Sequence, residues 1–156
     1  MNFTSAKNFF LKNKIKVSAA LGAILLFLVI LSIFSHIGTD RRLFLFPVSG
    51  SSKLQKEVRY LDSNPVQGKI QYYIDELILG PSLYRSRPIF TAGTKVEYCF
   101  MREKTLYVGL SEQAILQEGG SVEMSLAVSL FKENIQKNFK GIKNIELFID
   151  GNFIAY

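Results

Sequence analysis

The fold is decided by residues 94–110, which read TKVEYCFMREKTLYVGL. Apolar and aromatic side chains recur at every second position on both sides of Glu103 and Lys104, and this alternation is typical of a β-hairpin. We therefore predict strands over Thr94–Arg102 and Thr105–Leu110. The side chains that share one face are Val96, Tyr98 and Phe100 in the first strand and Leu106, Val108 and Leu110 in the second.

An amphipathic helix is predicted on each side of this hairpin. The first covers residues 66–79, ends at Gly80-Pro81 and carries its apolar stripe at Val66, Ile70, Tyr73, Ile74 and Leu77. The second covers residues 121–138 and carries its stripe at Met124, Ala127, Val128, Phe131 and Ile135. Each helix should therefore bury one face against the rest of the domain.

Short strands are predicted at both ends of this region. Leu43–Phe46 stops at Pro47, Lys53–Leu61 alternates loosely, and residues 145–149 end at an Asp150-Gly151 turn. The order is then strand, strand, helix, strand, strand, helix, strand. It predicts an α+β fold in which two helices cover one face of a small mixed or antiparallel sheet.

A charge-free run from Val17 to Ile37 follows a tail with four lysines and no acid. At about 1.5 Å per residue such a helix reaches roughly 32 Å, enough to cross the hydrocarbon core of a bilayer. The lysines favour a cytoplasmic amino terminus. The run is longer than the apolar part of a cleaved signal peptide, and no alanine-type cleavage site follows it. We expect a cytoplasmic tail at 1–16, a transmembrane signal-anchor helix at 17–37 and an extracytoplasmic domain at 38–156.

The net charge of +6 is distributed unevenly along the chain. Residues 1–42 hold six basic residues and one acid, whereas residues 43–156 hold thirteen Lys or Arg and twelve Asp or Glu. A nucleic-acid binder concentrates positive charge on its folded domain, because phosphate contacts supply much of the affinity. The charge distribution therefore disfavours nucleic acid as a partner.

The outer region shows no recognisable catalytic or metal-binding pattern. The single histidine, His36, lies in the apolar run, so residues 38–156 offer no imidazole for a hydrolytic triad or a histidine metal site. Cys99 is the single cysteine and has no nearby cation that would lower its thiol pKa, which favours a packing role. We predict no enzyme, no cofactor and no metal. A hydrolase that uses carboxylates alone stays an alternative.

Five ordered segments resemble the GerMN domain of sporulation and spore-germination proteins. They are ELILGP at 76–81, IFTAGTKV at 89–96, LYVGLS at 106–111, GIKNI at 141–145 and IDG at 149–151. The matching positions include Gly80, Pro81, Gly93, Thr94, Ser111, Asp150 and Gly151, and Thr91 stands where the family usually has proline. The resemblance implies an extracytoplasmic α+β module of the bacterial envelope. Such modules are often membrane-tethered, have no assigned catalytic activity and act through protein contacts.

Two surfaces are candidates for binding. The loop at 84–88 places Arg85 and Arg87 beside Tyr84, and guanidinium groups suit a carboxylate or phosphate partner. A solvated loop is the alternative reading of this segment. The other surface is the sheet face opposite the helices, where an apolar patch would mark a contact surface. If Val96, Tyr98 and Phe100 face the helices, the residues on that outer face are Cys99, Met101, Tyr107 and Phe148. Cover by the chain's own amino-terminal strand or tail is the alternative there.

The sequence therefore predicts a non-catalytic binding or scaffold module, tethered to the bacterial cytoplasmic membrane through Val17–Ile37. Its expected partner is an envelope protein or further copies of the chain itself. Recognition of an envelope polymer such as peptidoglycan, with Arg85 and Arg87 in contact with it, is the alternative within the binding class.

Overall fold

The computed structural model describes residues 3–34 and 38–155, leaving aside the side chains of residues 3–15, 17, 33 and 34. The chain divides into two compact units, Met1–Gly38 and Thr39–Tyr156. Among the described elements, the first unit holds one long helix and the second holds all of the strands.

The first unit is the helix α1, Phe3–Phe34. Its described large apolar side chains, which include Leu21, Phe27 and Leu31, are exposed. Within the residues described, no helix is both long enough and apolar enough to cross a membrane. The membrane span predicted at 17–37 includes residues 35–37 and the side chains of residues 17, 33 and 34, which lie outside the described residues. Most side chains of the predicted tail at 1–16 also lie outside them.

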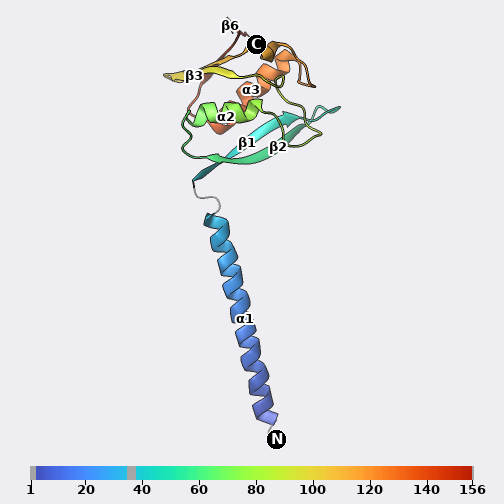
Figure 1. The fold of residues 1–156 in the computed structure, drawn as a ribbon, viewed down its shortest axis with the longest axis vertical. Helices are drawn as coiled ribbons and strands as arrows, with labels where there is room; N and C mark the ends of the chain where they lie inside the picture. Colours follow the sequence, from blue (N-terminus) through green and yellow to red (C-terminus); the bar gives the residue numbers. More distant parts are fainter. Residues whose placement is uncertain (1–2, 35–37, 156) are drawn as a thin grey trace. The chain divides into compact units, whose positions relative to one another are not determined.

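The second unit follows the predicted order of strands and helices (Figure 1). Its elements are β1 (Thr39–Pro47), β2 (Leu54–Asp62), α2 (Lys69–Ile78), β3 (Val96–Arg102), β4 (Thr105–Leu110), η1 (Glu112–Ile115), α3 (Met124–Asn138), β5 (Asn144–Ile149) and β6 (Asn152–Phe153). The short 3-10 helix η1 is an addition to the prediction, and β6 follows the predicted Asp150-Gly151 turn.

The strands form two sheets, so the prediction of a single sheet is wrong. β1 pairs with β2 along its full length, from Thr39 opposite Asp62 to Pro47 opposite Leu54. The other sheet has the order β3-β4-β5-β6. It is mixed, because β4 and β5 run parallel while the other neighbours run antiparallel.

Side chains of α3 occupy the second edge of β1, which explains why no further strand pairs there. Asn138 accepts a hydrogen bond from Leu43 N at 3.0 Å and donates one to Leu43 O at 2.7 Å. Asn134 makes the same two contacts with Leu45. The two amides lie one helical turn apart and stand in for the main chain of a neighbouring strand.

Both α2 and α3 lie between the two sheets (Figure 1). α3 packs against β1, α2 lies beside β3, and one apolar cluster joins the layers through residues such as Phe44, Tyr73, Val108 and Phe131. The predicted placement of two helices on one face therefore holds for the four-stranded sheet. The β1–β2 ribbon covers the opposite side of the helices, and the outer face of the four-stranded sheet points to solvent.

The helix α2 begins three residues later than predicted, at Lys69. Gly68 precedes it with φ +85°, a left-handed conformation that favours glycine, and its N–H closes a turn with Pro65 O at 3.0 Å. Val66 is fully exposed in this turn, so its assignment to the buried stripe is wrong. The remaining predicted stripe residues of α2 are buried or partly buried against the core.

Candidate functional site

Five aromatic side chains share the outer face of the four-stranded sheet, and we call them the outer aromatic face. They are Tyr98 and Phe100 on β3, Tyr107 on β4, Phe148 on β5 and Phe153 on β6. The strand register places Phe100 opposite Tyr107 and Phe148 opposite Phe153. The alternate positions of β4 and β5, such as Val108 and Leu147, are fully buried against the helices.

The rings of the outer aromatic face contact one another across all four strands. Phe100 and Tyr107 are stacked, with centroids 5.1 Å apart and planes 8° apart. Tyr98 lies 6.0 Å from Phe100 and 6.2 Å from Phe148, and Phe148 lies 5.5 Å from Phe153. These centroid separations fall in the range of favourable aromatic pairs. The rings therefore form one continuous apolar surface.

Gly109 makes room for this surface. It pairs with Tyr98 across β3 and β4, and a Cβ at position 109 would lie 2.2 Å from Cε1 of the Tyr98 ring. Because no side chain stands at position 109, the Tyr98 ring can lie over the strand.

The outer aromatic face is open to solvent at its margins. Phe100 is 52% exposed and Phe153 is 55% exposed, whereas Tyr98, Tyr107 and Phe148 are partly buried among the rings. Burial raises the pKa of the Tyr98 hydroxyl, and the charge of Glu97 raises it further. This tyrosine is therefore neutral at physiological pH and contributes a ring and a hydroxyl rather than a charge.

Two of the four residues predicted for this face lie elsewhere. Tyr107 and Phe148 are on the outer face, but the placement of Cys99 and Met101 there is wrong. The register of β3 shifts between Val96 and Tyr98, and this irregularity exchanges the two faces for the rest of the strand. Cys99 then pairs with Val108 and Met101 with Leu106, on the side of the helices.

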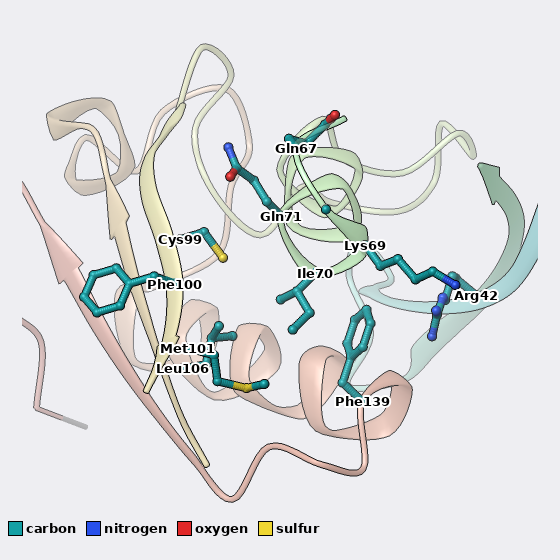
Figure 2. Close-up of a pocket in the computed structure, with 11 residues that line it drawn as sticks. Arg42, Gln67, Lys69, Ile70, Gln71, Cys99, Phe100, Met101, Leu106 and Phe139 are labelled. Carbon is teal, nitrogen blue, oxygen red and sulfur yellow. The ribbon is translucent and has the colours of Figure 1, made fainter. Parts of the chain in front are cut away.

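Cys99 and Met101 instead line a groove of about 460 Å³ (Figure 2). Its apolar wall also includes Ile70 of α2, Leu106 of β4 and Phe139 just after α3. Burial raises the pKa of the Cys99 thiol to about 11, with a further rise from the charge of Asp75. The thiol is therefore protonated at neutral pH, which is unlike the lowered pKa of a cysteine nucleophile.

The arginines of the predicted loop site do not face a common ligand position. Tyr84 and Arg85 are exposed. Arg87 instead donates from Nε to Gly120 O at 2.8 Å and from Nη2 to Ser121 O. Its guanidinium group fastens the loop to the segment before α3, so Arg87 has a structural contact that the sequence did not reveal.

The residues that carry the resemblance stand at turns and strand ends. Gly80 lies two residues after the end of α2 and has φ +90°, and a Cβ there would lie 3.3 Å from the Pro88 side chain. Thr94 Oγ1 donates to Thr91 O at 2.7 Å, after Gly93 with φ +89°. Ser111, just after β4, accepts a hydrogen bond at its Oγ from Lys95 N at 3.0 Å. Asp150 and Gly151 form the turn between β5 and β6, and both have positive φ. These positions shape the domain rather than form a site.

Arg59 is a structural residue that the sequence analysis missed. Its guanidinium group lies 4.7 Å from the centroid of the Phe44 ring and donates to the Glu57 carboxylate at 2.7 Å, the Glu76 carboxylate at 3.1 Å and the Gly80 carbonyl. The alternation on β2 did not reveal it, because the flanking apolar side chains Val58 and Tyr60 would be expected to face the core, yet they are 39% and 51% exposed. Separately, the described residues hold no group of three or more His, Cys, Asp and Glu side chains placed to bind a metal ion.

Comparison with known proteins gives a consistent fold. Residues 43–155 match the model of the Germane family, described as sporulation and spore germination. No curated protein matches the chain. Two solved structures of the Bacillus subtilis sporulation protein GerM are similar. Its first GerMN domain has 17% identity and a TM-score of 0.55 over 74% of this chain and 86% of that one. Its tandem GerMN domains have 12% identity and a TM-score of 0.56 over 74% and 40%.

A Clostridium perfringens structure, provisionally described as a lipoprotein, has 21% identity and a TM-score of 0.46 over 76% of this chain and 79% of that one. With 12% and 17% identity, the two GerM structures support the fold alone.

Proposed function

The chain belongs to the Germane family of sporulation and spore germination domains, and on that premise we propose that it is a non-catalytic, membrane-tethered contact module of the bacterial cell envelope. In this proposal, the outer aromatic face binds a protein partner. The single observation that carries it is the continuous layer of five rings on a solvent-facing sheet surface.

An aromatic outer face is unusual for a domain that works alone. A sheet with one solvated face normally carries polar side chains on that face. Exposed apolar patches mark interaction sites, and aromatic residues are enriched at the centres of protein interfaces. Phe100 and Phe153 are each more than half exposed, so a partner would remove both rings from water.

The tether is the second part of the proposal. The run from Val17 to Ile37 has no formal charge and follows four lysines, which supports a single membrane span with a cytoplasmic amino terminus. The apolar side chains of α1 that are described lie exposed rather than packed in a core. A bilayer would cover them. Residues 38–156 would then work outside the cytoplasm, close to the membrane.

A contact role also fits the chemistry of the described domain. Residues 39–156 contain no histidine, and the one thiol is held protonated. The predicted polymer-binding alternative depended on Arg85 and Arg87 together, and Arg87 is engaged with two main-chain carbonyls. The arginine pair proposed for polymer binding is therefore partly used within the fold, and this favours the protein-contact role.

Site-specific crosslinking in native membranes tests the contact role. A photoreactive phenylalanine analogue replaces Phe100 or Phe153 in the full chain, and Leu126, which is 43% exposed on α3, serves as the matched control position. We expect a discrete protein adduct from positions 100 and 153 and none from 126. An adduct with a second copy of the chain would identify the partner as self.

A different result would contradict the proposal. Equal crosslinking from all three positions, or none from any, would remove the outer aromatic face as the contact surface. Retention on purified cell wall that is lost in Arg85→Ala but kept in Phe100→Ala would favour the envelope polymer instead.

A further inference from the structure

The groove between α2 and β3 has an apolar wall and a cationic rim (Figure 2). Ile70 of α2, Met101 of β3 and Phe139, the residue after α3, point into it. Met101 is half exposed there, although it belongs to the helix side of its strand. The groove has a volume of about 460 Å³, which is within the range of ligand pockets, roughly 300–1,000 Å³.

The rim holds more positive than negative charge. Asp40 Oδ2 accepts from Arg42 at 2.9 Å and from Lys69 at 3.0 Å. The Asp40 carboxylate therefore pairs with both Arg42 and Lys69. Arg42 is further held by Asn138 O at 3.0 Å and by the Phe139 ring, whose centroid lies 4.5 Å from its Cζ. Lys69 is half exposed, so its ammonium group can contact a second anion at the mouth of the groove while it donates to Asp40.

The groove opens at one end of the domain, which we call the basic end. Lys143 N donates to Lys104 O at 2.8 Å, and this contact joins the turn after β3 to the segment after α3. Arg42 of β1 donates to Asn138 O at the end of α3, and Lys69 at the start of α2 pairs with Asp40 at the start of β1. These contacts join the starts of β1 and α2 to the end of α3. Arg42 and Lys69 line the groove itself. Five further cations stand in the sequence at or beside the segment ends named above, and they are Arg41, Arg102, Lys104, Lys140 and Lys143.

The basic end differs in charge from the rest of the domain. The acids at or beside the same segment ends are Asp40, Asp62 and Glu103, which gives three carboxylates for seven cations. The remainder of residues 39–156 holds eight Lys or Arg and ten Asp or Glu. The positive charge of a nearly neutral domain is therefore concentrated at these segment ends. Such a local excess of cations attracts anionic surfaces.

The basic end is also the part of the domain that follows α1 along the chain. β1 starts at Thr39, directly after the first unit ends at Gly38. If α1 spans the membrane, as the proposed function holds, only four residues of the sequence separate the end of α1 at Phe34 from Thr39. This inference rests on that tether.

We propose that the basic end binds an anionic phospholipid of the membrane that anchors the chain. The lipid phosphate lies against Lys69, Arg42 and Lys140, and an acyl chain occupies the groove along Ile70, Met101 and Phe139. Methionine suits this role because its flexible thioether adapts to a chain of variable shape. The contact adds a second attachment to α1 and restricts how the domain is presented to its partner.

Fluorescence quenching in lipid nanodiscs tests the proposal with the full chain. The protein has no tryptophan, so Met101→Trp supplies a unique fluorophore in the groove. Phe153→Trp supplies the matched control on the outer aromatic face. We expect brominated phosphatidylglycerol acyl chains to quench most of the emission of Met101→Trp and little of that of Phe153→Trp. Brominated phosphatidylcholine should quench Met101→Trp several-fold less.

Charge reversal gives the second comparison. Lys69→Glu with Lys140→Glu, added to Met101→Trp, should abolish the preference for phosphatidylglycerol. Lys53→Glu with Lys56→Glu changes the net charge equally on exposed positions of the β1–β2 ribbon and should preserve it. Tyrosine circular dichroism verifies folding of each variant.

Three outcomes would overturn the inference. Absence of quenching in both lipids would show that no acyl chain enters the groove. Equal quenching in both would show that the cations do not distinguish phosphatidylglycerol from phosphatidylcholine. In these two cases the chain is still in the disc and the tether stands. Failure of the chain to enter discs of either lipid would overturn the tether itself, and this inference with it.

Discussion

The side-chain amide of Asn134 hydrogen-bonds to both main-chain polar groups of Leu45, with 2.8 Å from Leu45 N to Oδ1 and 3.0 Å from Nδ2 to Leu45 O. Asn134 is fully buried, so water cannot replace these contacts. A buried asparagine on a helix thus completes the hydrogen bonding of a strand edge.

Replacing Asn134 with leucine should therefore destabilise the domain by roughly 2–4 kcal/mol, because two buried main-chain groups of Leu45 lose their partners. Thermal unfolding of the full chain in detergent micelles, followed by the tyrosine circular dichroism, measures the loss. Gln136→Leu lies on the exposed side of the same helix and should change the stability by less than about 0.5 kcal/mol. Similar effects from both variants would refute the edge-capping role.

The carboxylate of Glu57 should make stability depend on pH. Burial opposes its ionisation, but hydrogen bonds from Ser82 and Arg59 outweigh burial and lower the pKa of Glu57. A group with a lowered folded pKa adds stability above its unfolded pKa and loses it as the pH falls through the folded value. Glu57→Gln should therefore cost about 1–3 kcal/mol at pH 7.

The difference between wild type and Glu57→Gln should close as the pH falls below about 4.5, the ordinary value for this group. Unfolding curves at pH 3 and pH 7 provide the comparison. A gap that is the same at both pH values would mean that the charge of Glu57 is not what stabilises this contact.

Local periodicity accounts for most of the elements but not for how they combine. The hairpin at 94–110 and the stripe of α3 depend on side chains near one another in sequence, and both were predicted. The separation into two sheets depends on Asn134 meeting Leu45 across the fold. Nothing in the local pattern distinguishes an asparagine that caps a strand from one at a helix surface.

The candidate site was likewise predicted only where it depends on local sequence. The outer face was predicted as a contact surface, yet a register shift between Val96 and Tyr98 exchanged the residues of β3 that belong to it. Strict alternation cannot reveal a bulge, because one extra residue reverses every later position. The engagement of Arg87 with Gly120 likewise joins residues far apart in sequence.

The thiol of Cys99 should be slow to alkylate at neutral pH. Burial and the charge of Asp75 raise its pKa from 9.0 to about 11, so at pH 8 it carries about a hundred-fold less thiolate than an ordinary cysteine. The iodoacetamide rate should keep rising beyond pH 10. Asp75→Asn should lower the midpoint only in part, because burial is the larger cause. A plateau reached near pH 9 would contradict the buried placement.

The proposed orientation predicts the activity of a fused reporter. Alkaline phosphatase, which folds only outside the cytoplasm, should be active when attached after Tyr156 in the full chain. Replacing the four lysines of the tail, Lys7, Lys12, Lys14 and Lys16, with glutamine should reduce that activity, because the positive charge that retains the tail is lost. An inactive fusion to the wild-type chain would place the domain on the other side of the membrane.

Gly109 should be indispensable for the outer aromatic face. A methyl group at position 109 would lie 2.2 Å from the Tyr98 ring, and the backbone of Gly109 is not in the left-handed region, so Gly109→Ala acts through sterics alone. We expect a cost of roughly 1–3 kcal/mol from overpacking and a loss of crosslinking from position 100. Tyr98→Ala should remove the clash, so the double variant should be less destabilised than the two single effects predict. Strict additivity in this cycle would show that the glycine is not there to accommodate the Tyr98 ring.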